Sequence, residues 1–369
     1  MSPDEAEAQA ALLVEPLAAA AADSDHEGGF PGREFDWLRA AGLLAAPVAR
    51  SAGGADLGAP PHTLALLRTL QHLGRGNLAV GRLYEGHVNA LQLVASYGTP
   101  LQQERWAADA RQGHLFAVWN TEDRDGVRLE PLGGGRWRLG GGKTFASGAG
   151  HASRPLVTGA RPDGGWQMVV LPADRATPGI DRAAWRPLGM RATASFRVDL
   201  GGIEVSDDDL LGPPGAYYGQ PAFGGGAIRF VAVQLGGVEA VCDETRRFLR
   251  SLGRLDDPHQ QVRVGEMIAL LASGLNWLPP AAAQAALAAP GLVTFAAMMR
   301  AAVEPIALRV MVLAERCVGA RGLLQPGPLE RLHRDLTHYL RQAAPDATLP
   351  AVGCEELERE GRSGGLGRA

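Results

Sequence analysis

The chain has 369 residues, of which 46% are hydrophobic, and a formal net charge of −4 with a sequence pI near 6.2. A chain of this length can bury a large core and exceeds the usual size of one compact domain, so two or three packed units are expected. The weakly acidic balance, without a basic stripe, argues against nucleic acid as a partner. No run of about 18 uncharged apolar residues occurs, so no membrane span is expected.

Residues 1–29 are acidic and lack a basic segment followed by an apolar one, which predicts a helix and not a signal peptide. The three cysteines, Cys242, Cys317 and Cys354, are far apart in the sequence. Their spacing fits neither a metal-ligand pair nor a disulfide framework, so no metal site is predicted. We expect reduced thiols in a cytoplasmic protein.

Three regions differ in their hydrophobic pattern. Over residues 1–112 apolar residues recur at helical spacing, as at 62–74, which predicts a helical domain. Over residues 113–214 short alternating or apolar runs are separated by Gly, Pro and Asp, which predicts an antiparallel β-barrel or sandwich. Long amphipathic segments return over residues 215–369 and predict a helical bundle with a frayed Gly-rich end. The fold class is therefore mainly α with a central β-domain.

Two segments of the β-region carry the most information, KTFASGAG at 143–150 and GMRATASFRVDLGGIEVSDDDLLG at 189–212. The second resembles a turn and strand of the acyl-CoA dehydrogenase family, of the type G-M-R-x-(S/T) followed by V-x-V-P-x-x-N-L-L-G. Other parts of the chain resemble the family in the same order, at residues 35–58, 94–113, 226–241 and 328–340. The resemblance covers about residues 30–353. It implies an N-terminal helical domain, a β-barrel and a C-terminal four-helix bundle, with FAD between the β-domain and the helices.

The resemblance also implies contacts to the flavin ring. In the family, the segment matching residues 143–149 packs an aromatic ring on the flavin and places a hydroxyl near flavin N5, which assigns Phe145 as the ring and Ser147 as the hydroxyl donor. FAVWNTED at 116–123 stands where the family has Leu-Thr-Glu-Pro, so Trp119, Asn120 and Thr121 are expected at the pyrimidine edge. The alternatives are a Ser-Gly turn at Ser147 and a core strand position for Trp119.

The phosphate end of the cofactor is less well matched. The family's Gly-rich turn with a Ser is replaced by RDGV at 124–127, so Arg128 or a partner subunit would have to contact the pyrophosphate. Family members are usually homotetramers in which a neighbouring subunit's Arg grips the FAD diphosphate. Arg254 is the nearest match, with a solvated surface Arg as the alternative. The long apolar segment 295–313 independently predicts a homodimer or homotetramer through the bundle.

The family's catalytic base is missing from both of its usual positions. Dehydrogenation of an acyl-CoA needs a carboxylate to take the α-proton. In one branch the Glu lies nine residues after the Arg of an Arg-Asp pair. The pair in this chain is Arg334-Asp335, and the position nine residues after Arg334 is Ala343. In another branch the Glu immediately precedes an Arg on an earlier helix. That Arg is Arg229 in this chain, and the residue before it is Ile228. The segment 341–350 contains Asp346 as its only acid.

Three functions remain open on the sequence. The first is an FAD-dependent oxidoreductase of the acyl-CoA dehydrogenase type, acting on an acyl thioester or related small substrate and able to use an electron-transfer partner. The second is a reduced-flavin-dependent monooxygenase of the same fold, which needs no Glu and often carries the Ser-Gly seen at 147–148. His87 and His338 are its candidate catalytic residues, although a lone His on a helix is more often structural. The third is a non-catalytic scaffold of this fold.

Overall fold

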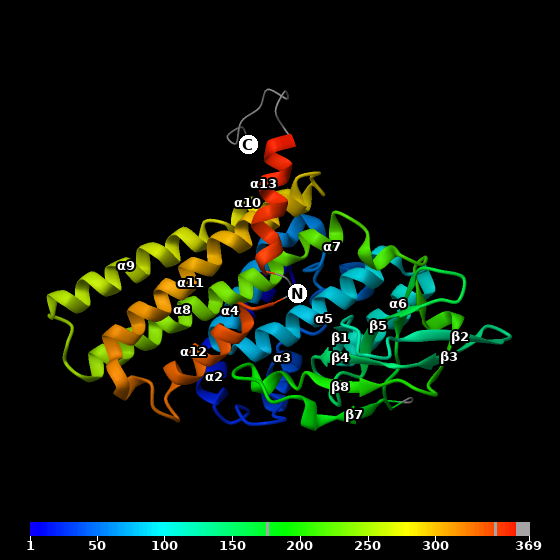
Figure 1. Ribbon diagram of the computed structural model, residues 1–369, viewed down its shortest axis with the longest axis horizontal. Helices are drawn as coiled ribbons and strands as arrows, with labels where there is room; N and C mark the ends of the chain where they lie inside the picture. Colours follow the sequence, from blue (N-terminus) through cyan, green and yellow to red (C-terminus); the bar gives the residue numbers. More distant parts are fainter. Residues whose placement is uncertain (175–176, 343–344, 359–369) are drawn as a thin grey trace.

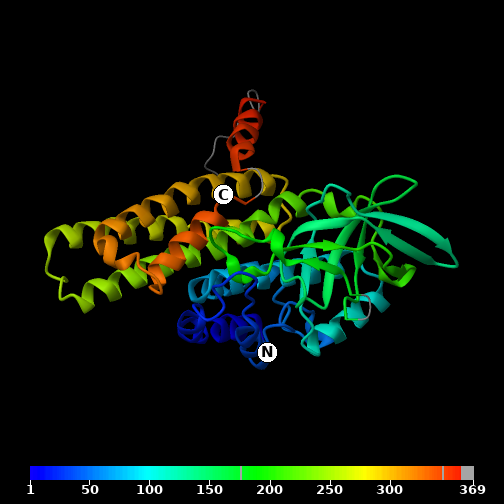
Figure 2. The same cartoon turned by 60° about the horizontal axis from the view of Figure 1, so that its bottom comes forward.

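The computed structural model describes residues 1–174, 177–342 and 345–358, in three regions that follow one another along the chain (Figure 1). Two helical regions lie against each other and the β-region closes one end of the molecule (Figures 1 and 2). The first strand begins at Phe116 and the last ends at Leu211. This arrangement confirms the predicted fold class.

The N-terminal region is built from six α-helices, three of which begin at a side-chain cap. The Asn77 side chain accepts the Ala79 N–H at 2.9 Å and starts the longest of these helices, and Thr99 with Gln102 forms a capping box that starts the next. The helices are α1 (Pro3–Leu12), α2 (Val14–Ala20), α3 (Gly32–Ala40), α4 (Thr63–Gly76), α5 (Leu78–Tyr97) and α6 (Pro100–Arg111).

The β-region contains a seven-stranded sheet and a three-stranded sheet. The larger sheet has the order β10-β6-β5-β2-β3-β9, with β1 also paired to β5, and the smaller has the order β4-β8-β7. The strands are β1 (Phe116–Trp119), β2 (Arg128–Gly133), β3 (Arg136–Gly140), β4 (Gly142–Ala146), β5 (Arg154–Ala160), β6 (Trp166–Val170), β7 (Gly179–Asp181), β8 (Phe196–Asp199), β9 (Glu204–Ser206) and β10 (Leu210–Leu211). The sheet is not purely antiparallel, because β1 and β2 both pair with β5 in parallel.

The C-terminal region is a bundle whose central helix is α8 (Ala227–Ser251). The helical stretch Ala222–Ser251 is long and apolar enough to cross a membrane, with a mean hydropathy of 1.3, but 72% of that window is buried inside the protein. It packs as a core helix against α4, α11 and α12. The other helices are α7 (Ala222–Gly225), α9 (Pro258–Leu275), α10 (Leu278–Ala286), α11 (Leu292–Gly322), α12 (Pro328–Tyr339) and α13 (Thr348–Glu358).

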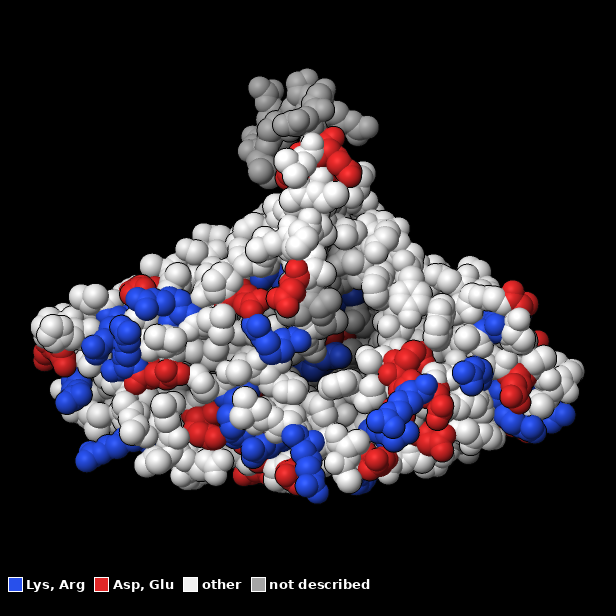
Figure 3. Space-filling view, in the orientation of Figure 1, with Lys and Arg blue, Asp and Glu red and all other residues white. Residues whose placement is uncertain are grey.

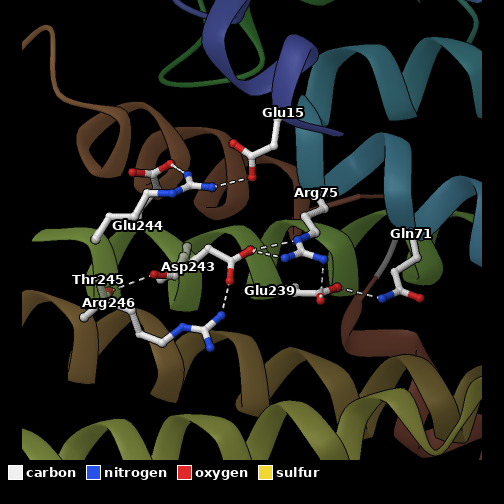
Figure 4. Close-up of polar contacts among 10 residues, drawn as sticks. Glu15, Gln71, Arg75, Glu239, Asp243, Glu244, Thr245 and Arg246 are labelled. Carbon is white, nitrogen blue, oxygen red and sulfur yellow. Dashed lines mark hydrogen bonds and ion pairs between the residues drawn. The ribbon is translucent and has the colours of Figure 1, made fainter. Parts of the chain in front are cut away.

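Helices α4 and α8 pack backbone against backbone. A Cβ on Gly236 would lie 2.0 Å from the Gln71 carbonyl oxygen, so only glycine permits this approach. Beside this contact, the Arg75 guanidinium reaches Glu239 at 3.0 Å and Asp243 at 2.7 Å (Figure 4). The N-terminal region and the bundle are therefore joined by close packing and by partly buried ion pairs.

The G-M-R turn of the β-region docks on the Arg-Asp pair of α12. A Cβ on Gly189 would lie 2.1 Å from the Arg334 carbonyl oxygen. The next residue, Met190, donates its backbone N–H to the Asp335 carboxylate at 2.5 Å. Burial raises the pKa of Asp335 to about 6. The two sequence motifs that were read separately thus form one contact between the β-region and the bundle.

Candidate functional site

An aromatic group lies where the β-region meets α12. Phe145, at the end of β4, has φ 51° and a side chain that is 57% exposed. Its ring meets Trp185 edge-on at 6.1 Å between centroids, and Trp185 meets His338 of α12 in the same way at 5.6 Å. A large apolar side chain held exposed in a left-handed backbone conformation is typical of a functional position. Phe145 and His338, distant in sequence, are therefore brought to one place.

Behind Phe145, three hydroxyl groups form a chain that ends on a carbonyl oxygen. Ser147 Oγ lies 2.9 Å from Ser195 Oγ, which lies 2.7 Å from Thr193 Oγ1, and Thr193 donates to the Met190 carbonyl at 2.9 Å. A carbonyl oxygen only accepts, and each hydroxyl has one hydrogen. Hence Ser195 donates to Thr193 and Ser147 donates to Ser195. The Ser147 oxygen is left as an acceptor for a further N–H, whereas the resemblance had assigned it as a donor.

The three residues expected at the pyrimidine edge occupy different environments. Trp119 is buried and its indole N–H donates to the Ser147 carbonyl at 2.9 Å, so its ring supports Ser147 from inside the β-region. The Asn120 side-chain oxygen accepts from Thr158 at 2.7 Å and from the Tyr218 hydroxyl at 3.0 Å. Thr121 has an exposed side chain, next to the segment that leads to Phe145.

The two histidine candidates differ sharply. His87 is fully buried, its Nδ1 accepts the Phe116 N–H at 3.1 Å, and its Nε2 therefore carries the hydrogen donated to the Leu44 carbonyl at 2.8 Å. Burial lowers the pKa of His87 to about 4. This neutral ring ties α5 to β1, a structural arrangement. His338 is partly buried, and burial lowers its pKa as well.

The remaining predicted positions lie apart from this group or outside the description. Ile228 occupies the position where one branch of the family has its Glu, and it is buried in the first turn of α8. Ala343 lies outside the described residues, as does the Gly-rich end. Arg254 is exposed in the loop from α8 to α9, at the end of the bundle away from the β-region (Figure 1). Within one subunit, Arg254 is therefore remote from Phe145.

A polar cluster beside Ile228 was missed by the sequence interpretation. The Glu85 carboxylate of α5 is only 5% exposed and accepts from Arg82 at 2.7 Å and from Asn89 at 2.6 Å. Arg229 of α8 places its Nε 3.8 Å from the same carboxylate. The spacing of Arg82, Glu85 and Asn89 by three and four residues puts them on one face of a helix, a signal that was available in the sequence.

The residues around Phe145 suit a flavin ring. The exposed ring of Phe145 offers an apolar face, and the Ser147 oxygen beside it offers an acceptor to an N–H at the edge of a planar heterocycle. At the turn where the family holds the pyrophosphate, Arg124 and Arg128 are both exposed. The described residues therefore offer an apolar face and an acceptor to a flavin ring, and two exposed guanidinium groups to a phosphate.

Comparison with known proteins identifies two matching domains. Residues 5–114 match the acyl-CoA dehydrogenase N-terminal domain and residues 214–339 match the acyl-CoA dehydrogenase C-terminal domain. The dibenzothiophene monooxygenase of Rhodococcus erythropolis is 27% identical over 263 residues, 66% of this chain and 61% of that protein. The acryloyl-CoA reductase (NADH) of Anaerotignum propionicum is 25% identical over 354 residues, 88% of this chain and 86% of that protein.

The fold has a similar counterpart among solved structures. Dibenzothiophene monooxygenase TdsC of Paenibacillus sp. A11-2, solved with FMN and indole, superimposes with a TM-score of 0.85 at 23% identity, over 96% of this chain and 97% of that one. At this identity the likeness concerns the fold. The two domain matches together cover more than half of the chain, which therefore belongs to the acyl-CoA dehydrogenase family.

Proposed function

We propose that this protein is a flavin-dependent oxidoreductase of the monooxygenase type, which takes up reduced flavin and oxidises a small substrate with oxygen. The observation that carries the proposal is the direction of the hydroxyl chain at Ser147. Flavin N5 bears a hydrogen only in the reduced ring, while the oxidised ring has a lone pair there. If Ser147 faces N5, as the family resemblance implies, its acceptor oxygen favours reduced flavin.

Three residues of this chain would hold the flavin ring in different ways. Phe145 would pack on the flavin ring, Ser147 would accept from its edge, and Trp119 would fix the Ser147 backbone through its indole N–H. Reduced flavin, when bound, supplies the electrons for oxygen activation. His338 is uncharged at neutral pH because burial lowers its pKa, so it can accept a proton at the junction with α12.

Acyl-CoA dehydrogenation is the second candidate, supported by the similarity to acryloyl-CoA reductase over most of the chain. The site argues against it, because Ile228 is apolar and both oxygens of the nearby Glu85 already accept hydrogen bonds. Because Arg82 and Asn89 already bond these oxygens, the Glu85 carboxylate is not directed to a substrate proton. A non-catalytic scaffold is the third candidate and would bind no flavin.

Anaerobic titration of FMN and FAD, in oxidised and reduced forms, tests the proposal. Wild-type protein should bind reduced flavin about tenfold more tightly than oxidised flavin, and Ser147→Ala should lose most of that preference. Ser251→Ala, an exposed position on α8, is the matched control. Equal affinity for both forms would contradict the proposed role of Ser147. No binding of either flavin would favour the scaffold.

A second experiment separates the two enzymatic candidates. The flavin-loaded protein is mixed anaerobically with a panel of acyl-CoAs and the flavin absorbance is followed. We expect little bleaching, because general-base catalysis typically contributes about 10² to 10⁴-fold, Ile228 is apolar and both Glu85 oxygens already accept hydrogen bonds. Rapid bleaching would instead establish a dehydrogenase, with electrons passed to an electron-transfer partner.

We further propose that the protein assembles as a homodimer or homotetramer through the bundle and acts in the cytoplasm. Val262 of α9 and Leu308 and Val312 of α11 are exposed apolar residues, and a second copy would cover them. In such an assembly, Arg254 would contact the diphosphate of the flavin bound to a neighbouring subunit. Light scattering that reports a monomer at micromolar concentration would contradict the assembly, and cell fractionation tests the compartment.

A further inference from the structure

Arg229 has a nearly buried guanidinium that forms a long ion pair with Glu85 but has no hydrogen-bond acceptor for its Nε. It stands in the first turn of α8, next to Ile228, and its side chain is 18% exposed. Its Nε is buried and has no hydrogen-bond partner, and the nearest carboxylate oxygen, on Glu85, lies 3.8 Å away. A distance of 3.8 Å is too long for a hydrogen bond. Arg229 therefore has donors to offer.

Glu85 does not neutralise the cluster. One of its oxygens accepts from Arg82 at 2.7 Å and the other from Asn89 at 2.6 Å. Two guanidinium groups face a single carboxylate, which leaves one positive charge in a largely buried place. An uncompensated buried charge is strongly unfavourable unless an anion or further acceptors complete the site.

A tyrosine adds a second unpartnered donor. The Tyr339 side chain is 1% exposed and its hydroxyl has no hydrogen-bond partner. It lies close enough to Arg82 and Glu85 to interact with them electrostatically, and burial raises its pKa. Tyr339 therefore keeps its hydrogen at neutral pH. A guanidinium N–H and a phenol O–H that both lack acceptors are groups expected around a bound anion.

The cluster is not sealed from solvent, because the Arg82 and Arg229 side chains are 21% and 18% exposed. Figure 3 shows a hollow below α13, between the bundle and the β-region, with Lys or Arg and Asp or Glu atoms at its floor. Figure 1 shows α5 and the α7 end of α8 near the junction of the bundle and the β-region, and Arg229 stands in the first turn of α8. The helix ends that carry the cluster therefore lie beside the hollow between the bundle and the β-region.

We infer that Arg229, assisted by the Tyr339 hydroxyl, binds an anionic group carried by the substrate, such as a carboxylate or a sulfinate. The identification of this ligand as the substrate rests on the proposed function. The flavin phosphate has the same chemistry and is the other source of an anion for this site. We assign a small organic anion, and the flavin affinities measured in parallel distinguish it from the flavin phosphate.

The test compares two ligands that share a ring. Indole and indole-2-carboxylate are titrated calorimetrically into wild-type protein and into Arg229→Gln, Arg229→Lys and Arg250→Gln. Arg250→Gln removes an exposed guanidinium from the same helix and is the matched control. The affinities for FMN and FAD are measured in parallel, and thermal unfolding shows whether each variant is folded.

We expect wild-type protein to bind the carboxylate about 10- to 100-fold more tightly than indole, since a hydrogen bond to a charged group is among the stronger polar contacts. Arg229→Gln should abolish this preference, Arg229→Lys should retain part of it, and Arg250→Gln should not change it. Equal binding of the two ligands by wild-type protein would overturn the inference. A loss of flavin affinity in Arg229→Gln with the preference intact would also overturn it, by assigning the site to the flavin phosphate. A carboxylate preference in a protein that binds no flavin would support the anion site and refute the proposed function.

Discussion

The group at Phe145 and Ser147 lies in the β-region, whereas the cluster at Arg82, Glu85 and Arg229 lies between two helices. The first belongs to one short segment of the β-region, and its residues were assigned from the order of letters in that segment. The second is built from two helices that meet only in the folded protein. A site within one turn or strand can be predicted from a short segment of the sequence. A site made by the packing of two helices can be recognised only in the tertiary structure.

The largest expected effect is on the helix-built cluster. Replacing Glu85 with Ala leaves the buried Arg82 and Arg229 without a carboxylate, and breaking a buried pair in this way costs about 3 to 5 kcal/mol. Urea unfolding measures the loss. Arg229→Ala at the same site should be much less damaging, because it removes the surplus positive charge. Equal destabilisation by both changes would contradict the charge imbalance that the structure indicates.

The docking contact between the β-region and α12 should respond to pH. The pKa of Asp335 is raised from 3.8 to about 6, so the folded protein holds this proton more tightly than the unfolded chain does, which corresponds to about 3 kcal/mol. Its contribution to stability is full below pH 4 and is lost as the pH rises through 6. Asp335→Asn should remove this part of the pH dependence while keeping an acceptor for Met190. The free energy of unfolding between pH 4 and pH 7 is the measurement, and identical slopes for both proteins would refute the assignment.

The same contact can be disturbed from the β-region. Gly189→Ala places a Cβ against the Arg334 carbonyl oxygen, and such overpacking costs about 1 to 3 kcal/mol. Gly140→Ala, in β3, meets no atom within 4 Å and serves as the control. Thermal unfolding should separate the two variants. If Gly189→Ala were as stable as the control, the turn would not be docked on α12.

The smallest effect is expected within the hydroxyl chain. Ser195→Ala removes the acceptor for Ser147, whose hydrogen is then free to bond the lone pair of an oxidised flavin. The preference for reduced over oxidised flavin should fall by about 2- to 10-fold, the size of one neutral hydrogen bond. Anaerobic fluorescence titration measures the two affinities. A preference that rises in Ser195→Ala would reverse the inferred direction of the chain.

The sequence by itself determined the three-part fold and the family. Helical and strand periodicity are local properties, and the Gly and Pro positions that interrupt them mark where the regions change. It also marked Phe145 and Ser147, because one continuous segment carries both. The parallel pairing of β1 and β2 with β5 was not predictable, since partners in a sheet are chosen by long-range contacts that alternation does not encode.

Tertiary structure decided what each candidate side chain does. His87 reads as a possible catalytic residue on its helix, yet the approach of β1 and of Leu44 occupies both ring nitrogens. Trp119 is expected beside the cofactor, and the folded structure directs its indole N–H to the Ser147 carbonyl. Arg229 is an ordinary helix residue until α5 brings Glu85 near it without pairing it fully. The role of a polar group depends on which partners burial leaves it, and those partners come from elements far apart in the chain.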